Sequence, residues 1–386
     1  MTDPQRRPRW DLFCSVVDNY GDIGVCWRLA RQLVAEFGLE VRLWVDDLHS
    51  FQRLLRSLDP TRDEQIRRGV CVRRWGEPLE PEPSVADVVI EAFACTLPAS
   101  YIAAMAARKS APVWINLEYL SAEAWVGECH GLASPHPQLP LRKHFFFPGF
   151  GADTGGLLRE RGLLERRRAF QADSAGLAAF WHRLELPQPA PGELRLSLFS
   201  YGSAELPALL HCWSASPRPV FCLLPEGRYA EPVAHWFGQE GAEPGAHWQR
   251  GNLQVRVMPF LEQDNYDRLL WACDLNLVRG EDSFVRAQWA GRPLVWQLYR
   301  QQENAHRIKL QAFLDRYTAG LASGPARALY DFWQAWDRET GVAAAWPAFI
   351  AHYDALMRHA EDWIERQKKV GDLATNLVRF CRGSRL

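Results

Sequence analysis

Short apolar runs alternate with amphipathic stretches in the first half of the chain. The first run covers residues 10–17, and apolar side chains then recur every three or four positions from Ile23 to Phe37, a spacing that predicts a helix. Further apolar runs occupy 41–45, 88–90 and 112–117, with helical stretches between them. Buried strands that alternate with helices form parallel sheets. The pattern therefore predicts an α/β domain over residues 1–185.

A proline-rich segment separates this pattern from a second one. Residues 186–193 contain three prolines and a glycine, which is typical of a linker. Apolar runs resume at 194–201, 219–224, 253–258, 273–278 and 293–299, and helical stretches follow at about 304–317 and 346–367. We expect a second α/β domain over 194–360 and a C-terminal helix over 361–386. Two such domains favour a ligand site in a cleft between them.

The loop after the first apolar run is a candidate reaction centre. It contains the segment Asp18-Asn19-Tyr20-Gly21-Asp22. Loops at the carboxyl edge of an open α/β sheet bind ligands, and two carboxylates four residues apart can form a reactive pair there. On these residues alone a structural interpretation is slightly favoured, because Asp22 could cap the helix that follows.

A second candidate begins at Arg279, directly after the apolar run at 273–278. Asp282 or Ser283 can cap the next helix, whose free N–H groups, together with the charge of Arg279, favour an anion such as a diphosphate. Phosphates would repel Glu281, whose carboxylate suits the hydroxyls of a ribose or sugar. A capped helix with a surface Arg–Glu pair explains the same residues.

An aromatic segment precedes this second candidate by one βα unit. Phe260, Gln263 and Tyr266 lie between the apolar run ending at 258 and a predicted helix. The two aromatic rings could pack the loop, or they could stack on a nucleobase whose edge Gln263 reads by hydrogen bonds.

The composition excludes several classes of function. The 386 residues are 47% hydrophobic and 24% charged, as expected for a soluble globular protein with two domains. A formal net charge of −1 gives no electrostatic basis for binding nucleic acid or an anionic membrane. We expect a cytoplasmic protein, because no signal peptide is evident and the nine cysteines follow no disulfide pattern.

Metal and dinucleotide motifs are missing from the sequence. There is no D-x-D, H-E-x-x-H or C-x-x-C, and the pair Cys129-His130 has no spaced partners, so we expect no metal site. The glycines of 149–156 imitate a dinucleotide fingerprint, but Thr154 stands where the third glycine should be. We therefore expect no NAD site.

Four segments together resemble the family of protein-arginine rhamnosyltransferases that modify bacterial elongation factor P. They cover residues 17–29, 91–95, 116–123 and 279–288. The resemblance implies a GT-B fold, in which two Rossmann-like domains face a central cleft and a C-terminal helix returns to the first domain. It implies inverting transfer of L-rhamnose from dTDP-β-L-rhamnose to an arginine of elongation factor P, with no cofactor.

The resemblance also assigns roles to residues. Asp18 and Asp22 match essential carboxylates, of which one would clamp the guanidinium and the other accept its proton; which is the base stays open. The segment between them, Asn19, Tyr20 and Gly21, is expected to contact substrate. Phe199, Phe260, Gln263 and Tyr266 match a nucleotide-base pocket, Arg279, Glu281, Asp282 and Ser283 match a diphosphate and deoxyribose site, and Tyr201 is a looser match.

Two alternatives accompany this hypothesis. The first is a GT-B transferase that uses another nucleotide sugar or another acceptor. The second is a non-catalytic protein that binds a translation factor. The intact set of Asp18, Asp22 and Arg279 argues against the second alternative, because a pure binding protein has no use for it.

Overall fold

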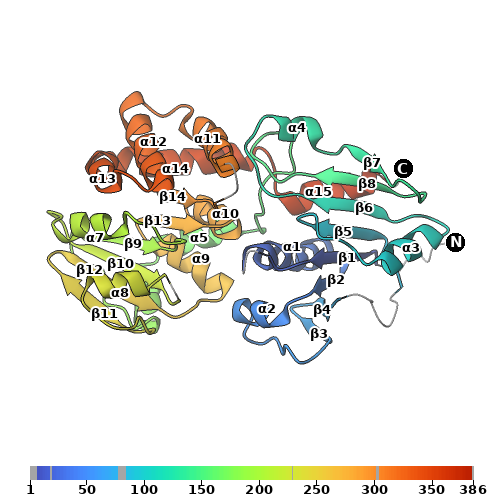
Figure 1. Cartoon of the computed structure of the whole chain (residues 1–386), viewed down its shortest axis with the longest axis horizontal. Helices are drawn as coiled ribbons and strands as arrows, with labels where there is room; N and C mark the ends of the chain where they lie inside the picture. The colour runs from blue at the N-terminus through green and yellow to red at the C-terminus, as the bar shows by residue number, and fades with distance from the viewer. Residues whose placement is uncertain (1–6, 18–19, 77–83, 228, 301–303, 385–386) are drawn as a thin grey trace. The chain divides into compact units, whose positions relative to one another are not determined.

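The computed structural model describes residues 7–17, 20–76, 84–227, 229–300 and 304–384 (Figure 1). Two compact units make up the chain: unit 1 is Met1–Arg161 with Gln367–Leu386, and unit 2 is Gly162–Arg366. Each unit is an α/β structure built on a largely parallel sheet. No helix in the described ranges is long and apolar enough to cross a bilayer.

Within the described residues, unit 1 contains an eight-stranded sheet in the order β3-β4-β2-β1-β5-β6-β8-β7. Its strands are β1 (Arg9–Cys14), β2 (Glu40–Val45), β3 (Glu64–Arg67), β4 (Val70–Arg74), β5 (Val88–Ala92), β6 (Val113–Leu117), β7 (Ala133–Pro135) and β8 (Arg142–Phe146). The edge strands β3 and β7 pair antiparallel, whereas the strands between them run parallel. The loops that follow β1, β5 and β6 therefore share the carboxyl edge of the sheet.

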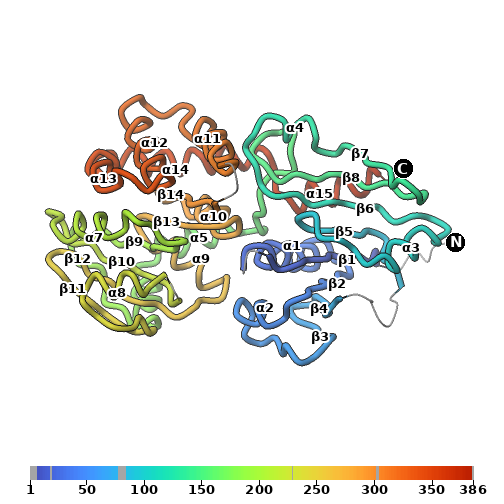
Figure 2. Tube along the Cα trace, in the orientation of Figure 1, coloured from blue at the N-terminus to red at the C-terminus, as the bar shows by residue number. Residues whose placement is uncertain are grey.

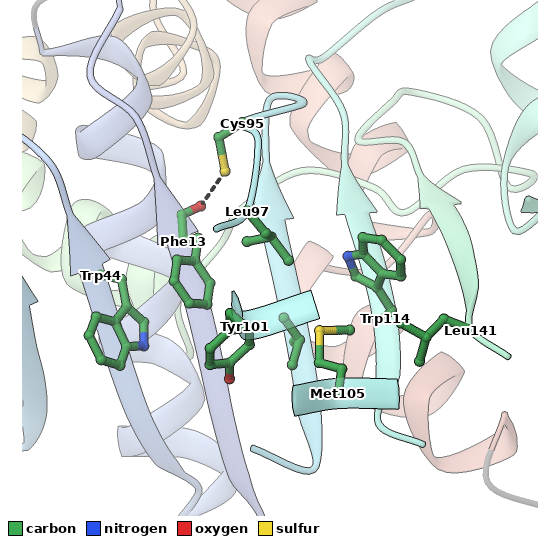
Figure 3. Close-up of a cluster of buried hydrophobic side chains, with 9 residues drawn as sticks. Phe13, Trp44, Cys95, Leu97, Tyr101, Met105, Trp114 and Leu141 are labelled. Carbon is green, nitrogen blue, oxygen red and sulfur yellow. Dashed lines mark hydrogen bonds between the residues drawn. The ribbon is translucent and has the colours of Figure 1, made fainter. Parts of the chain in front are cut away.

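An aromatic cluster on one face of this sheet fixes β1 (Figure 3). Phe13 stacks on Trp44 of β2 with ring centroids 5.4 Å apart, and Tyr101 meets its edge at 5.0 Å. The Cys95 thiol donates a hydrogen bond to the Phe13 carbonyl oxygen at 3.4 Å. This cluster anchors both β1 and the turn after β5.

The helices of unit 1 include one from the end of the chain. They are α1 (Gly21–Phe37), α2 (Leu48–Leu54), α3 (Ala99–Ala107), α4 (Trp125–Cys129) and α15 (Leu373–Gly383). The tube in Figure 2 shows α15 beside β8, and Phe380 packs edge-on against Phe146 with ring centroids 5.6 Å apart. At its start, Asp372 accepts hydrogen bonds from Gln32 Nε2 of α1 at 3.1 Å and from Thr375 N at 2.9 Å.

The described part of unit 2 forms a six-stranded sheet in the order β11-β12-β10-β9-β13-β14. Its strands are β9 (Leu194–Leu198), β10 (Val220–Pro225), β11 (His247–Arg250), β12 (Leu253–Met258), β13 (Leu275–Arg279) and β14 (Leu294–Gln297). Its helices are α5 (Leu163–Ala172), α6 (Ser174–Arg183), α7 (Leu206–Ser214), α8 (Glu231–Trp236), α9 (Gln263–Ala272), α10 (Asp282–Trp289), α11 (Ala305–Thr318), α12 (Ser323–Arg338), α13 (Val342–Ala351) and α14 (Tyr353–Lys368). Only β11 is antiparallel among the described strands of this sheet.

The boundary between the units differs from the predicted linker at 186–193. Unit 2 begins at Gly162, so α5 and α6 belong to it. Gln171 Nε2 of α5 donates hydrogen bonds to the carbonyl oxygens of Trp271 and Ala290 at 3.0 and 3.2 Å. The proline-rich segment therefore connects two elements of unit 2, α6 and β9, and does not separate the units.

Candidate functional site

The Asp22 carboxylate lies at the carboxyl edge of the sheet of unit 1. It is in the first turn of α1, is 3% exposed, and accepts a hydrogen bond from Val17 N through Oδ2 at 3.1 Å. Tyr20 occupies the N-cap position, and Gly21 is the first helical residue. The alternative in which Asp22 caps α1 is therefore wrong, because the helix begins one residue before it. Asp18 and Asn19 lie outside the described residues.

A second carboxylate holds the same loop from the end of β2. Asp46 Oδ1 accepts a hydrogen bond from Val16 N at 2.9 Å, so adjacent backbone amides of the loop bind different carboxylates. At the end of β1, a hydrogen bond with Cys26 and burial raise the pKa of the Cys14 thiol well above its usual range. This thiol therefore stays protonated.

The predicted nucleotide-binding residues lie at the carboxyl edge of the sheet of unit 2. Phe199 and Tyr201 follow β9, Phe260 follows β12, Gln263 and Tyr266 are in α9, Arg279 ends β13, and Glu281, Asp282 and Ser283 begin the α10 segment. Glu281 is the N-cap and Asp282 the first residue of α10. The predicted cap by Asp282 or Ser283 is thus wrong, because Gly280 at φ +64° turns the chain into the helix earlier than expected.

A buried ionic network joins α9 to α10. Asp282 Oδ2 accepts hydrogen bonds from Gln263 Nε2 at 3.1 Å and from Arg286 Nε at 2.8 Å. Arg286 also donates through Nη1 to Asp267 Oδ1 at 2.8 Å. The Asp282 side chain is therefore engaged inside the protein, where it orients the Gln263 amide.

The guanidinium of Arg279 is surrounded by aromatic rings. Its Cζ atom lies 4.4 Å from the ring centroid of Phe199, 4.5 Å from that of Tyr201 and 5.0 Å from that of Tyr229. Such contacts hold a cation by its attraction to the ring faces. Sequence reasoning missed Tyr229, because its place beside Arg279 follows from the order of β10, β9 and β13 in the sheet.

The aromatic residues predicted for the base pocket are only partly assembled. Phe199 and Tyr266 meet edge to face with ring centroids 6.1 Å apart. Burial raises the pKa of the Tyr266 phenol well above its usual range, so it stays protonated. Phe260 is tied through its backbone, because its N–H donates to Glu226 Oε1 at 3.0 Å.

No cluster of three or more His, Cys, Asp or Glu side chains in the described ranges has the arrangement of a metal site. The positive charge available to an anion at the edge of unit 2 includes Arg279, and the N-terminus of α10 adds its N–H groups. The site can therefore hold a phosphorylated ligand with protein groups.

Removing the Asp282 carboxylate is expected to destabilise unit 2. The side chains of Asp282 and Arg286 are 11% and 1% exposed, and a buried charge that loses a partner is costly. Because Asp267 still pairs with Arg286, we expect Asp282→Ala to lower the free energy of unfolding by about 2 kcal/mol or more. Urea denaturation followed by tryptophan fluorescence measures it.

The chain offers a matched control for this change. Arg327 and Asp331 form another pair four residues apart on α12, with side chains 78% and 44% exposed. We expect Asp331→Ala to cost less than about 1 kcal/mol. Equal losses in the two variants would contradict a structural role for the buried network.

Comparison with known proteins gives a consistent result. The model of the EarP family, described as elongation factor P (EF-P) rhamnosyltransferase, matches residues 10–382. A protein-arginine rhamnosyltransferase of Pseudomonas putida KT2440 is 52% identical over 97% of this chain and 99% of its own length. The Shewanella oneidensis MR-1 relative of the same name is 40% identical, with 100% of both chains covered.

A solved structure extends the comparison to the fold. A structure that explains EarP-mediated arginine glycosylation of translation elongation factor EF-P superposes with a TM-score of 0.71 at 39% identity, covering 98% of this chain and 100% of the other. Together with the two α/β units, this likeness confirms the predicted GT-B fold class.

Proposed function

Because this chain belongs to the EarP family of EF-P rhamnosyltransferases, we propose that it transfers L-rhamnose from dTDP-β-L-rhamnose to an arginine of EF-P, with inversion. The observation that carries the proposal is the family match over residues 10–382, which includes the Asp22 loop and the Arg279 segment. We also propose that the reaction takes place in the cytoplasm, where translation factors act.

Asp22 is the proposed catalytic carboxylate in unit 1. A guanidinium has a pKa above about 12 and is a poor nucleophile, so the base must act as the new bond forms. In the proposed step, an arginine nitrogen attacks the anomeric carbon, the bond from that carbon to the diphosphate breaks, and a carboxylate accepts the proton. A single displacement of this kind inverts the sugar carbon. Asp18 would bind and orient the guanidinium.

The donor is assigned to the edge of unit 2. Phe199 and Tyr266 would contact the thymine, and the Gln263 amide, oriented by Asp282, would hydrogen-bond its edge. Arg279 and the N–H groups of α10 would stabilise the charge that develops on the departing diphosphate. Glu281, at the start of α10, would bind the deoxyribose hydroxyl.

We expect the reaction to proceed without a divalent metal. Arg279 and the N-terminus of α10 would stabilise the charge of the leaving diphosphate. Excess EDTA is therefore expected to leave the rate within about twofold of the untreated rate. Loss of a catalytic metal would have a much larger effect, because such a metal lowers the barrier by several kcal/mol. A rate that collapses with chelator and returns with magnesium or manganese would contradict the proposal.

Intact-mass analysis of EF-P tests the proposed function directly. Incubation with this protein and dTDP-β-L-rhamnose is expected to add one deoxyhexose residue, and fragmentation is expected to place it on an arginine. A shift that appears only with another nucleotide sugar would favour the alternative transferase. Binding of EF-P without any shift, across a panel of nucleotide sugars, would favour a non-catalytic protein.

A further inference from the structure

Two segments singled out in the sequence, 91–95 and 116–123, have no part in the chemistry described so far. The first follows β5 and the second follows β6, and these strands are neighbours with Glu91 opposite Asn116 and Ala92 opposite Leu117. Strand β5 also pairs with β1, with Phe13 opposite Glu91. Both segments therefore leave the sheet at the edge where the Asp22 loop lies.

The turn after β5 has an unusual backbone. Phe93 and Ala94 are consecutive non-glycine residues at φ +57° and +54°, a region that costs free energy for residues with a side chain. Hydrogen bonds from Phe93 N to Leu117 O at 2.7 Å and from Cys95 N to Ala92 O at 3.1 Å hold this turn. The sheet thus keeps two residues in a costly conformation, which is characteristic of functional sites.

The result of this turn is an aromatic pair at the sheet edge. The ring of Phe93 stacks on that of Tyr119, with centroids 4.5 Å apart and planes 23° from parallel. Tyr119 is nevertheless 41% exposed, so the pair is not part of the core. A flat aromatic surface open to solvent suits a planar ligand, and guanidinium groups stack on such surfaces.

Polar groups beside the stack suit a donor-rich ligand. Glu118, next to Tyr119 in the chain, accepts a hydrogen bond from Asn116 Nδ2 at 2.6 Å. Asn116 is 2% exposed, and no hydrogen bond reaches its Oδ1 atom from the described residues. The segment after β6 therefore carries a carboxylate directly before the exposed ring of Tyr119, and a guanidinium offers five N–H donors and a planar face to such a pair.

We propose that Phe93 and Tyr119 form the platform on which the guanidinium of the acceptor arginine stacks, with the Glu118 carboxylate accepting its hydrogen bonds. The proposal rests on the proposed function and adds the acceptor site to it. The two rings would hold the plane of the guanidinium at the sheet edge that bears Asp22. Hydrogen bonds to the Glu118 carboxylate would fix how the guanidinium is turned within that plane. An acceptor lysine would keep its charge but lose the planar contact.

Steady-state transfer to EF-P at saturating dTDP-β-L-rhamnose tests the platform. Tyr119→Leu removes the ring and is expected to raise the KM for EF-P by about fivefold or more, whereas Tyr119→Phe keeps the ring and is expected to restore most of that loss. Glu118→Gln is expected to raise the same KM. The Kd for dTDP, measured by calorimetry, is expected to stay at the wild-type value in all three variants, because unit 2 is unchanged.

Trp125 provides a matched control. It is an aromatic residue of unit 1 that is 46% exposed, and it packs edge-on against Phe147 with ring centroids 5.4 Å apart. We expect Trp125→Leu to leave the KM for EF-P within about twofold of wild type, a change smaller than the loss of a cation–π contact.

The outcomes separate this inference from the proposed function. If the wild-type protein adds no sugar to EF-P, both the proposed function and the platform are wrong. If the wild type transfers rhamnose and Tyr119→Leu has the wild-type KM, the platform is wrong and the function stands. A KM raised equally in Tyr119→Leu, Tyr119→Phe and Trp125→Leu also overturns the platform, because the edge would then be a general protein contact.

Discussion

Asp22→Asn is expected to lower kcat for rhamnose transfer by roughly 10²- to 10⁴-fold, the range that general-base catalysis contributes. Asparagine has nearly the same shape, and its Oδ1 can still accept the hydrogen bond that Val17 N now gives to Oδ2 at 3.1 Å. The substitution removes the charge and the basicity of a side chain that is 3% exposed. The loop should therefore keep its conformation while the proposed proton acceptor is lost.

The measurement separates chemistry from binding. Single-turnover formation of rhamnosylated EF-P, followed by intact mass, reports the chemical step, and calorimetry with dTDP reports the donor site. Asp46→Asn is the matched control, since Asp46 binds the next amide of the same loop, Val16 N, at 2.9 Å and is not proposed to touch substrate. We expect the single-turnover rate of the Asp46→Asn variant to fall by less than about tenfold, because the substitution weakens one exposed hydrogen bond.

A near-normal turnover in Asp22→Asn would remove this residue from the mechanism and leave Asp18 as the candidate base. A fall of equal size in Asp46→Asn would instead show that the loop tolerates no change in either supporting hydrogen bond. Circular dichroism and thermal unfolding of both variants identify a loss that comes from misfolding.

Arg279→Leu is expected to raise the Kd for dTDP by about ten- to hundredfold, the effect of losing charge-assisted hydrogen bonds to a diphosphate. The arginine ends β13 and is held within 4.4 to 5.0 Å of three ring centroids. It is therefore positioned before the ligand arrives. Arg279→Lys keeps the charge but loses the planar fork, so we expect an intermediate Kd.

Deoxythymidine provides an internal check on this assignment. It lacks the diphosphate, so Arg279→Leu is expected to change its affinity much less than that of dTDP. Arg250→Leu is the matched control, because Arg250 ends β11 with its Cζ atom 4.1 Å from the Trp236 ring centroid. Wild-type dTDP affinity in Arg279→Leu, or an equal loss in Arg250→Leu, would show that the diphosphate site lies elsewhere.

Much of the fold follows from local pattern in the sequence. The apolar runs at 10–17, 88–90 and 112–117 overlap β1, β5 and β6, because strands of a parallel sheet are buried on both faces and read as continuous apolar segments. The positions of the strand-to-helix loops then follow from the alternation of strands and helices along the chain. The placement of Asp22 and Arg279 at sheet edges could therefore be predicted, whereas their catalytic and binding roles stay predictions.

What the sequence could not supply depends on contacts between distant residues. The assignment of α5 to unit 2 rests on hydrogen bonds from Gln171 to carbonyl groups about a hundred positions away, and no local composition records them. Tyr229 joins Arg279 through the order of β9, β10 and β13 in the sheet. The start of α10 depends on Gly280 at φ +64°, which a preference for Asp or Ser caps does not reveal.

The return of the chain to unit 1 through α15 has a consequence for its synthesis. Unit 2 is a continuous insertion, Gly162–Arg366, within a unit whose last piece is Gln367–Leu386. On the ribosome, every residue of unit 2 is therefore available before unit 1 receives α15. Until then the surfaces of α1 and β8 that α15 covers stay exposed, so unit 1 completes its fold only after Gln367–Leu386 has been made.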